Sequence, residues 1–340
     1  MYETVTPIPL KTSTSSLFNN LDILPTNGEE ESSSLRNASY LSIHKYEVGI
    51  VQRNNASFAH RQVIAKESSS QHNTFLIDAK WCQLKNQTIL VIAHVRGFQM
   101  FDELGNLLLF WHSTLERGVL SEGKTAFCRG ISSLGDTVFV GTCKGEILVV
   151  ETMEMNTFNV SQTLSAHPSP VTTITTLKDA PPHAKVNVAS ADDEGSISVW
   201  KMREEGKLKF VGSITGSRYP CTALCLLNDG LLAASYYTGH IRIFDAPTQE
   251  MLAEITAHVA PISSMDCYNA RDHSLLLSGG EDTYLRVWKI SKTDKLKISQ
   301  EWYTYVEDLL ICGVKFHPGT DEMCAVTGYD SNEITLFKKT

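Results

Sequence analysis

Long hydrophobic runs are missing from this chain of 340 residues. Its longest purely apolar stretches, LLLFW and ILVIA, are five residues each, whereas a helix that crosses a bilayer needs about 20. The start, MYETVTPIPL, has neither the basic stretch nor the apolar core of a signal peptide. We therefore expect a cytoplasmic protein with no integral membrane contact, which would reach vesicles or the cytoskeleton only through its partners.

Positive charge is scarce as well. Lys and Arg number 30 against 38 Asp and Glu, which gives a net charge of −8, and no run of basic residues occurs. Proteins that bind nucleic acid or acidic membranes without sequence specificity do so through clustered Lys and Arg. The composition therefore argues against nucleic acid and favours a protein or peptide partner, a basic one by charge complementarity.

The sequence also lacks the patterns of metal sites and catalytic centres. It has no C-x-x-C pair, no H-E-x-x-H, no G-x-S-x-G and no calcium loop. Eight scattered cysteines without a secretory signal are typical of reduced thiols in a cytosolic protein. We expect no metal, no cofactor and no catalytic residue. An enzyme built on the fold that the repeats described below predict is a less favoured alternative, because acids and histidines are scattered along the chain.

One motif points to nucleotide binding. Residues 118–125 read GVLSEGKT, a full match to the phosphate-binding G-x-x-x-x-G-K-T loop. Such a loop works because a helix follows it and aims backbone N–H groups at the phosphate. Here AFCRGISSLGDT follows, with two glycines and no helical periodicity. We interpret the match as a connection between β-sheets and keep nucleotide binding as a minor alternative, to be tested by ATP affinity after Lys124→Ala.

What the chain does contain is a repeated strand pattern. The segments Thr256–Ile290 and Ser165–Met202 each run from a small residue plus His, through short β-like stretches, to a Trp that ends a strand. Repeats of this length that end in a Trp resemble WD40 repeats, from which β-propellers are built. Weaker copies end at other apolar residues, 44 to 50 positions apart. The complete set of closing residues is Phe101, Val150, Trp200, Phe244, Trp288 and Phe337.

This spacing predicts an all-β fold, a single seven-bladed WD40-type β-propeller that occupies residues 1–340 as one domain. The first blade falls near YEVGIVQ, one period before Phe101. The last blade has only three strands before the chain stops at Thr340, so we expect the N-terminal strand, about residues 3–10, to supply the fourth. Pro7 and Pro9 suit such an edge strand, because neither can donate a ladder hydrogen bond.

The resemblance to WD40 repeats implies a structural tetrad in the two strong copies. In the first copy it comprises His258, Ser278, Asp282 and Trp288. Trp donates, whereas Ser and neutral His both donate and accept, so the chain can satisfy every buried polar group. The second copy offers His167, Ser190 and Trp200 but has Glu194 where Asp is expected, with Asp192 and Asp193 just before it. Its fourth member is left open.

Beyond the repeat, the chain resembles one particular family, that of WD repeat-containing protein 54. The stretches that carry this resemblance are VRGFQMFDELGNLLLFWH, FVGTCKGEILVVE, LLSGGEDTYLRVWKIS and AVTGYDSNEITLF. The resemblance implies a cytoplasmic propeller with no catalytic residues to transfer. We therefore expect a non-catalytic scaffold or adaptor that binds proteins or peptides. A substrate-receptor adaptor of a ubiquitin ligase is the alternative, weakly supported because Trp200–Arg203 lacks the Asp of the W-D-x-R motif.

Propellers of this class resemble rigid platforms whose partners dock on one face, at the mouth of the central channel. The residue just before the tetrad Asp tends to point at the partner. Counting seven positions back from each closing residue gives His94, Cys143, Asp193, Tyr237, Glu281 and Asp330. Three of the six are acidic and one is Tyr, a favoured interface anchor. We expect them to bind a basic partner segment, with Tyr237 as anchor; the alternative is that they are solvated turn residues.

Overall fold

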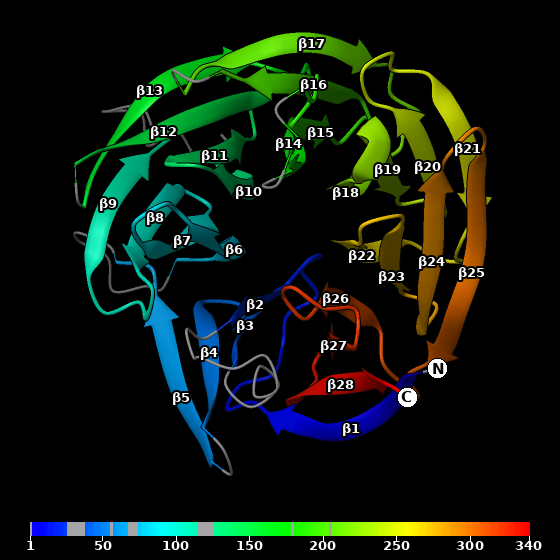
Figure 1. The fold of residues 1–340 in the computed structure, drawn as a ribbon. Coiled ribbons are helices and arrows are strands. Elements are labelled where there is room, and N and C mark those ends of the chain that lie inside the picture. Colours follow the sequence, from blue (N-terminus) through cyan, green and yellow to red (C-terminus); the bar gives the residue numbers. More distant parts are fainter. Residues whose placement is uncertain are drawn as a thin grey trace.

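The computed structural model describes residues 2–25, 38–54, 57–66, 74–114, 126–154, 156–177, 180–181, 183–203 and 206–340. Within them, 28 strands form seven four-stranded antiparallel sheets that stand like blades around a central channel (Figure 1). The prediction of an all-β, seven-bladed propeller is confirmed. The loop at 118–125 that resembles a phosphate-binding motif lies outside the described residues.

The blades are numbered along the chain, with the innermost strand of each given first. Blade 1 is β2 (Leu21–Pro25), β3 (Ala38–Ile43), β4 (Glu47–Asn54) and β5 (Ser57–Ile64); blade 2 is β6 (Leu76–Gln83), β7 (Thr88–His94), β8 (Gly97–Asp102) and β9 (Leu108–Ser113). Blade 3 is β10 (Cys128–Leu134), β11 (Thr137–Thr142), β12 (Glu146–Glu154) and β13 (Thr157–Ser165); blade 4 is β14 (Val171–Thr176), β15 (Val188–Asp192), β16 (Ile197–Met202) and β17 (Leu208–Ile214). Blade 5 is β18 (Cys221–Leu226), β19 (Leu231–Tyr236), β20 (His240–Asp245) and β21 (Met251–Thr256), with the 3-10 turn η1 (Asn228–Gly230) after β18; blade 6 is β22 (Ile262–Asn269), β23 (Ser274–Gly280), β24 (Tyr284–Lys292) and β25 (Leu296–Tyr305). Blade 7 is β26 (Ile311–Phe316), β27 (Met323–Gly328), β28 (Glu333–Lys339) and the N-terminal β1 (Tyr2–Pro9).

The two ends of the chain meet in blade 7, where β1 pairs antiparallel with β28 (Figure 1). This confirms that the N-terminal strand closes the ring. Pro7 falls where the register shifts between Val5 and Ile8, and Pro9 ends the strand, so no ladder N–H is lost in regular pairing. Ile8 is fully buried between blades 7 and 1. Closure also covers β28, which would otherwise expose a sheet edge to other chains.

The hydrophobic core lies between the blades rather than inside any one of them. Each buried apolar cluster combines side chains from two neighbouring blades: Phe244 packs with blade 4, for instance, and Trp288 with blade 5. All six closing residues named from the sequence lie in the third strand of their blade and are buried. Burial of apolar surface against both neighbours therefore fixes the angle between blades and makes the ring rigid.

One side of the ring carries the turns between the second and third strands and the connections between blades. We call it the top face. Each connection bonds to the turn of the blade before it, as when the N–H of His167 donates to the carbonyl of Gly145 and that of His258 to Gly239. Gly145 and Gly239 have φ of +77° and +81°, and a Cβ there would collide with the carbonyls of His167 and His258. Turns and connections are thus built as one surface.

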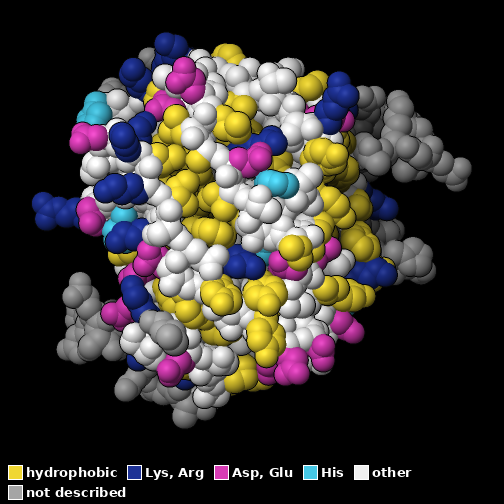
Figure 2. Space-filling model, turned by 90° about the vertical axis from the view of Figure 1, so that its right-hand side faces the viewer, with side chains coloured by type: hydrophobic (Ala, Val, Ile, Leu, Met, Phe, Trp, Pro, Cys, Tyr) yellow, Lys and Arg dark blue, Asp and Glu magenta, His cyan; other side chains and the backbone are white. Residues whose placement is uncertain are grey.

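The outer surface has a different character. On the side formed by β21 and β25, hydrophobic side chains are interspersed with Lys, Arg, Asp and Glu (Figure 2). Exposed apolar residues here, such as Met251 and Tyr303, project from outer strands. Single apolar residues on a mixed surface are ordinary in soluble proteins. Among the described residues, no helix is long and apolar enough to span a membrane.

Candidate functional site

The strongest repeat folds into one hydrogen-bonded chain of side chains in blade 6. The Trp288 indole N–H donates to Ser278 Oγ at 3.1 Å, and Ser278 Oγ lies 2.9 Å from His258 Nε2. His258 Nδ1 lies 2.9 Å from Asp282 Oδ1. A neutral His258 with its proton on Nδ1 satisfies all these contacts, with the Ser278 hydroxyl donating to Nε2. The chain fastens the connection before blade 6 to the turn at Asp282.

In blade 4 the acid that faces His167 is Asp192, not Glu194. Trp200 Nε1 donates to Ser190 Oγ at 3.2 Å, and Ser190 Oγ lies 2.8 Å from His167 Nε2. His167 Nδ1 then faces Asp192 Oδ2 at 3.5 Å, beyond a well-formed hydrogen bond. The other Asp192 oxygen accepts the backbone N–H groups of Glu194 and Ser196. The acid comes from the end of β15, two positions earlier than in blade 6.

The remaining blades show why Ser and Trp occur together. In the register of Ser278, blades 2, 3, 5 and 7 have apolar side chains, and none of their closing residues is Trp. These apolar residues are Ile92, Val140, Ala234 and Val326. A buried indole N–H needs an acceptor, whereas Phe or Val at the same place does not. Both Trp residues therefore have a hydroxyl acceptor, although a hydroxyl in this register does not require an indole, since blade 1 has Ser42 there with Val51 in the closing position.

The Ser, His and Asp of blade 6 do not form a hydrolytic centre. Ser278 and His258 are buried in the blade, and the Ser278 hydroxyl is held between the indole and the imidazole. Burial alone would raise the pKa of Asp282, but hydrogen bonds from His258 and from the N–H groups of Tyr284 and Val259 hold that pKa below its ordinary value. The network keeps Asp282 ionised as an acceptor and stabilises the turn.

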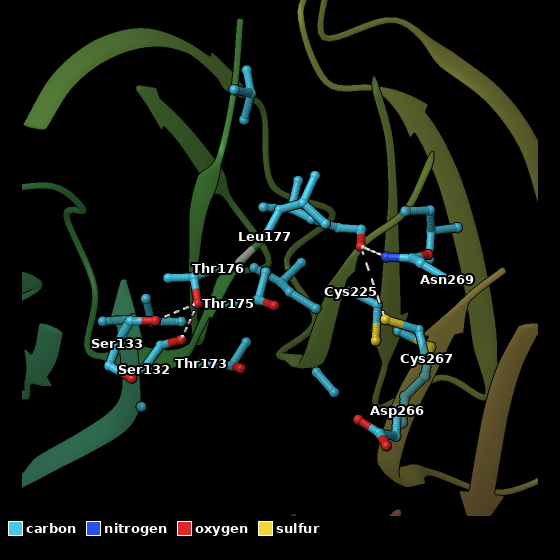
Figure 3. Close-up of a pocket in the computed structure, with 18 of the residues that line it drawn as sticks. Ser132, Ser133, Thr173, Thr175, Thr176, Leu177, Cys225, Asp266, Cys267 and Asn269 are labelled. Carbon is cyan, nitrogen blue, oxygen red and sulfur yellow. Dashed lines mark hydrogen bonds between the residues drawn. The ribbon is translucent and has the colours of Figure 1, made fainter. Parts of the chain in front are cut away.

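The central channel has a volume of about 1270 Å³ and a polar wall. Figure 3 shows Ser132, Ser133 and Thr176 of β10 and β14 on one side, and Cys267 and Asn269 of β22 on the other. These side chains bond mainly to neighbouring inner strands: Thr176 reaches Ser132 and Ser133, and Asn269 donates to the carbonyl of Leu226 (Figure 3). The polar groups of the wall therefore mainly form hydrogen bonds that hold neighbouring blades together.

One half-buried cation of this wall is Lys315 of β26. Its Nζ lies 3.0 Å from Asp266 Oδ1, and the second Asp266 oxygen accepts the N–H of Phe316. Burial opposes the charge of Lys315, but Asp266 and, to a lesser degree, Asp22 raise its pKa above the ordinary value. The pair links blades 6 and 7, and its charges are already compensated.

At the top face the channel mouth is crossed by the segment that joins β1 to β2. The N–H of Asn19 lies 2.8 Å from the carbonyl of Cys312 and 3.2 Å from that of Ser263, and Asn19 Nδ2 donates to the carbonyl of Thr222 at 2.9 Å. These carbonyls belong to blades 7, 6 and 5. Phe18 stacks against Tyr237, with ring centroids 6.2 Å apart and an interplanar angle of 24°. Residues 10–20, which we call the strap, thus clamp three blades and form part of the top face.

Four of the six residues predicted for the partner face occupy one structural position. The backbone N–H of Cys143, Asp193, Tyr237 and Glu281 each donates to the carbonyl just before the innermost strand of the same blade. These residues open the turn between the second and third strands, which has three residues in blades 3, 5 and 6 and four in blade 4. Tyr237 is 48% exposed, and the other three are partly exposed.

The predictions for His94 and Asp330 miss this position by one residue. The equivalent position is Val95 in blade 2 and Tyr329 in blade 7, because it lies six and eight residues before the closing residue in these blades instead of seven. His94 is the last residue of β7 and only 1% exposed, so it cannot reach a partner, and burial lowers its pKa to about 4. Asp330 is exposed, but it lies beside the position, and its N–H donates to the carbonyl of Thr14 in the strap.

Several exposed apolar residues near Tyr237 were missed from the sequence. They gather on the turns and connections of blades 5 to 7, and comprise Tyr219, Val259, Leu310 and Tyr329. Val259 is 94% exposed although its N–H is fixed by Asp282. We call these four residues and Tyr237 the aromatic half of the top face. In the sequence each of them is an apolar residue in or directly beside a turn or connection. Counting back from the closing residues does not select these positions.

Basic and acidic side chains occupy different parts of the top face. The turns of blades 2 and 3 carry Arg96 and Lys144, whereas those of blades 6 and 7 carry Glu281 and Asp330. Asp193 of blade 4 faces Arg129 at 3.8 Å, which partly compensates it. Glu281, by contrast, has no ion pair with any residue in the described part of the chain. Its charge adds to the burial that raises the pKa of the neighbouring Cys312 thiol to about 12.

Comparison with known proteins bears on this arrangement. The model of the family described as WDR54 matches residues 1–340. The chain belongs to the WDR54 family. WD repeat-containing protein 54 from Homo sapiens is 30% identical over 337 residues, which cover 97% of each chain. The resemblance named from the sequence is therefore confirmed, and it extends over the whole propeller of this WDR54 family member.

Solved structures share the fold of this WDR54 chain at much lower identity. A chain in the crystal structure of the mitotic checkpoint complex superposes with a TM-score of 0.72 at 15% identity, covering 99% of this chain and 96% of that one. The WD40 β-propeller domain of Doa1 gives 0.66 at 14% identity, covering 100% and 97%. At such identities the likeness concerns architecture alone. In the described part of the chain, no group of three or more His, Cys, Asp or Glu side chains is placed to hold a metal ion.

Proposed function

We propose that this WD40 propeller is a non-catalytic interaction platform that binds partner proteins through its top face. The observation that carries the proposal is the aromatic half of that face, where Tyr219, Tyr237, Val259, Leu310 and Tyr329 are all exposed on three successive blades. Exposed apolar groups gathered on one face mark interaction sites in soluble proteins. Tyr is also enriched among the residues that dominate binding energy.

The surrounding structure supports the same proposal. Connections and turns bear the exposed side chains, and both are fixed to each other by backbone hydrogen bonds. A rigid surface loses little conformational freedom when a partner docks, which favours affinity. The described Ser–His–Asp network is buried and structural, so it supplies no reaction chemistry. The chain of similar fold in the mitotic checkpoint complex is part of a protein assembly.

The charge of the top face suggests what kind of partner binds. Glu281 and Asp330 lie on turns of the same blades as the aromatic half, and the whole chain carries a net charge of −8. A basic partner segment would be steered towards this half and held away from the Arg96 and Lys144 side. The proposal therefore names a basic protein segment, with Tyr237 as its anchor.

The test is affinity purification of the tagged protein from its own cells, followed by mass spectrometry. We expect a defined set of co-purifying proteins that falls at least about tenfold in the Tyr237→Ala/Glu281→Lys variant, because one anchor and one matched charge are both removed. The matched control is Tyr303→Ala/Glu301→Lys, which makes the same chemical changes on the outer strand β25, where both residues are exposed.

Circular dichroism and thermal melting would verify that both variants stay folded. A partner set retained in full by Tyr237→Ala/Glu281→Lys, or lost equally in both variants, would contradict binding through the top face. If a ubiquitin ligase appears in the lost set, the platform is an adaptor of that enzyme.

A further inference from the structure

One part of the top face combines a stacked aromatic pair with an uncompensated acid. Phe18 of the strap packs against Tyr237, a residue that is still 48% exposed. Glu281 lies on the turn of the next blade. A single connection, residues 257–261, is hydrogen bonded to both turns: the N–H of His258 donates to Gly239, and that of Glu281 to Pro261. The aromatic pair and the carboxylate are therefore neighbours on one rigid surface.

The strap fixes the inner border of this surface. Asn19 follows Phe18 directly and bonds to carbonyls of blades 5, 6 and 7. Asn20 is fully buried, and its side chain bonds to Ser15 and Thr327. Phe18 is thus held in place by the two anchored asparagines that follow it in the chain and by its contact with the ring of Tyr237. The strap therefore borders the aromatic pair on the channel side, and we expect a partner segment to lie across the face beside it.

The protein shows elsewhere which group such a set accommodates. On blade 5 the Arg242 guanidinium lies 4.8 Å from the centre of the Tyr236 ring, and its Nε donates to Glu254 Oε2 at 2.7 Å. Tyr and Glu together hold the planar cation by stacking and by a charge-assisted hydrogen bond. Tyr237 and Glu281 present the same two groups, and no cation of the described chain pairs with Glu281.

We propose that Tyr237 and Phe18, with Glu281 beside them, receive an arginine side chain from an extended segment of the partner protein. This rests on the proposed function and specifies what the platform recognises. Arginine suits the site better than lysine, because its flat guanidinium can stack on an aromatic ring and donate to a carboxylate at once. Lysine offers a compact, strongly hydrated charge that does only one of these well.

The test uses the full-length protein and arrays of short synthetic peptide pools. Each pool fixes its central residue as arginine, lysine or citrulline and randomises the flanks. Citrulline keeps the shape of arginine without the charge. We expect the arginine pool to retain about tenfold more wild-type protein than the citrulline pool, the size of one desolvated cation–π and carboxylate contact. Lysine should fall between them.

Variants test whether the preference for arginine depends on the three residues of the proposed site. Tyr237→Ala and Glu281→Lys should each abolish the arginine preference, and Phe18→Ala should weaken it, whereas Tyr303→Ala and Glu301→Lys should leave it intact. Equal retention of arginine and citrulline, no retention of any pool, or a preference that survives both Tyr237→Ala and Glu281→Lys would overturn the inference. Retention that increases in Phe18→Ala would overturn it too, because Phe18 would then obstruct the site.

The two proposals can fail separately. If co-purifying partners depend on Tyr237 and Glu281 but the arrays show no arginine preference, the platform stands and arginine recognition falls. If arginine peptides are preferred but the cellular partner set is insensitive to both residues, the site binds arginine and the proposed function falls.

Discussion

Replacement of Ile8 by aspartate is expected to lower the free energy of unfolding by at least about 4 kcal/mol. Ile8 is fully buried where the N-terminal strand packs between the last and first blades. The change removes apolar burial and places a carboxylate where the surrounding cluster is hydrophobic. Because β1 is the strand that closes the ring, the loss of this packing weakens the pairing of the N-terminal strand with blade 7. Urea unfolding, monitored by tryptophan fluorescence, measures this change in the free energy of unfolding.

The matched control is Ile8→Val, which keeps the shape and should cost only about 1 kcal/mol. We also expect Ile8→Asp to self-associate on size-exclusion chromatography, since loosening of β1 uncovers the edge of β28. An aspartate variant as stable as the valine variant would show that β1 contributes little to closure, and the account of blade 7 would be wrong.

The second large effect is expected at Ser278. Ser278→Ala leaves the Trp288 indole N–H and the His258 Nε2 without their shared partner inside blade 6. Each buried group that loses its hydrogen bond costs about 1–3 kcal/mol, so we expect a loss of about 2–4 kcal/mol in the free energy of unfolding. Thermal and urea unfolding of the variant would measure it. Exposed Ser299→Ala serves as the control and should change stability by less than about 0.5 kcal/mol.

A double variant separates the network from simple packing. Blade 5 has Ala234 and Phe244 at the positions of Ser278 and Trp288, so Ser278→Ala/Trp288→Phe copies a combination that the chain already uses. We expect the double variant to be more stable than the sum of the single losses predicts, by about 1–2 kcal/mol, because alanine no longer faces an unpaired indole. Strict additivity would mean that the Trp–Ser hydrogen bond contributes nothing beyond packing.

The architecture could be predicted from the sequence because its signals are local and repeated. Every closing residue from Phe101 to Phe337 lies in the third strand of its blade, as the spacing indicated. The N-terminal strand could be assigned because blade 7 lacked one strand and Pro7 and Pro9 suit an edge. Apolar alternation and turn residues at a regular period leave few other folds.

The details of the top face were less predictable, because they depend on turn length. A turn one residue shorter in blade 2 buries His94 and presents Val95, and a longer turn in blade 7 presents Tyr329 beside Asp330. Counting along the chain cannot register such insertions. Asp192 of blade 4 was similarly displaced by two positions from the expected acid, since it reaches His167 from the strand end.

The strap could not be predicted at all. Asn19 and Phe18 have no repeat counterpart, and their partners Thr222, Cys312 and Tyr237 lie more than 200 residues away in the sequence. Contacts between segments this distant follow from ring closure, which pairs β1 with β28 and leads the chain from there past blades 5 to 7 to β2. Only the folded ring shows that the predicted anchor Tyr237 has an aromatic neighbour from the N-terminus.

The most direct test of the platform is site-specific photo-crosslinking in cells. A benzophenone amino acid replaces Tyr237 in one strain and Tyr303 in another, and the tagged protein is recovered after irradiation. Binding through the aromatic half of the top face predicts discrete partner adducts at position 237 and none of those adducts at position 303. The same adducts from both positions, or adducts from position 303 alone, would contradict the proposal that partners dock on this face.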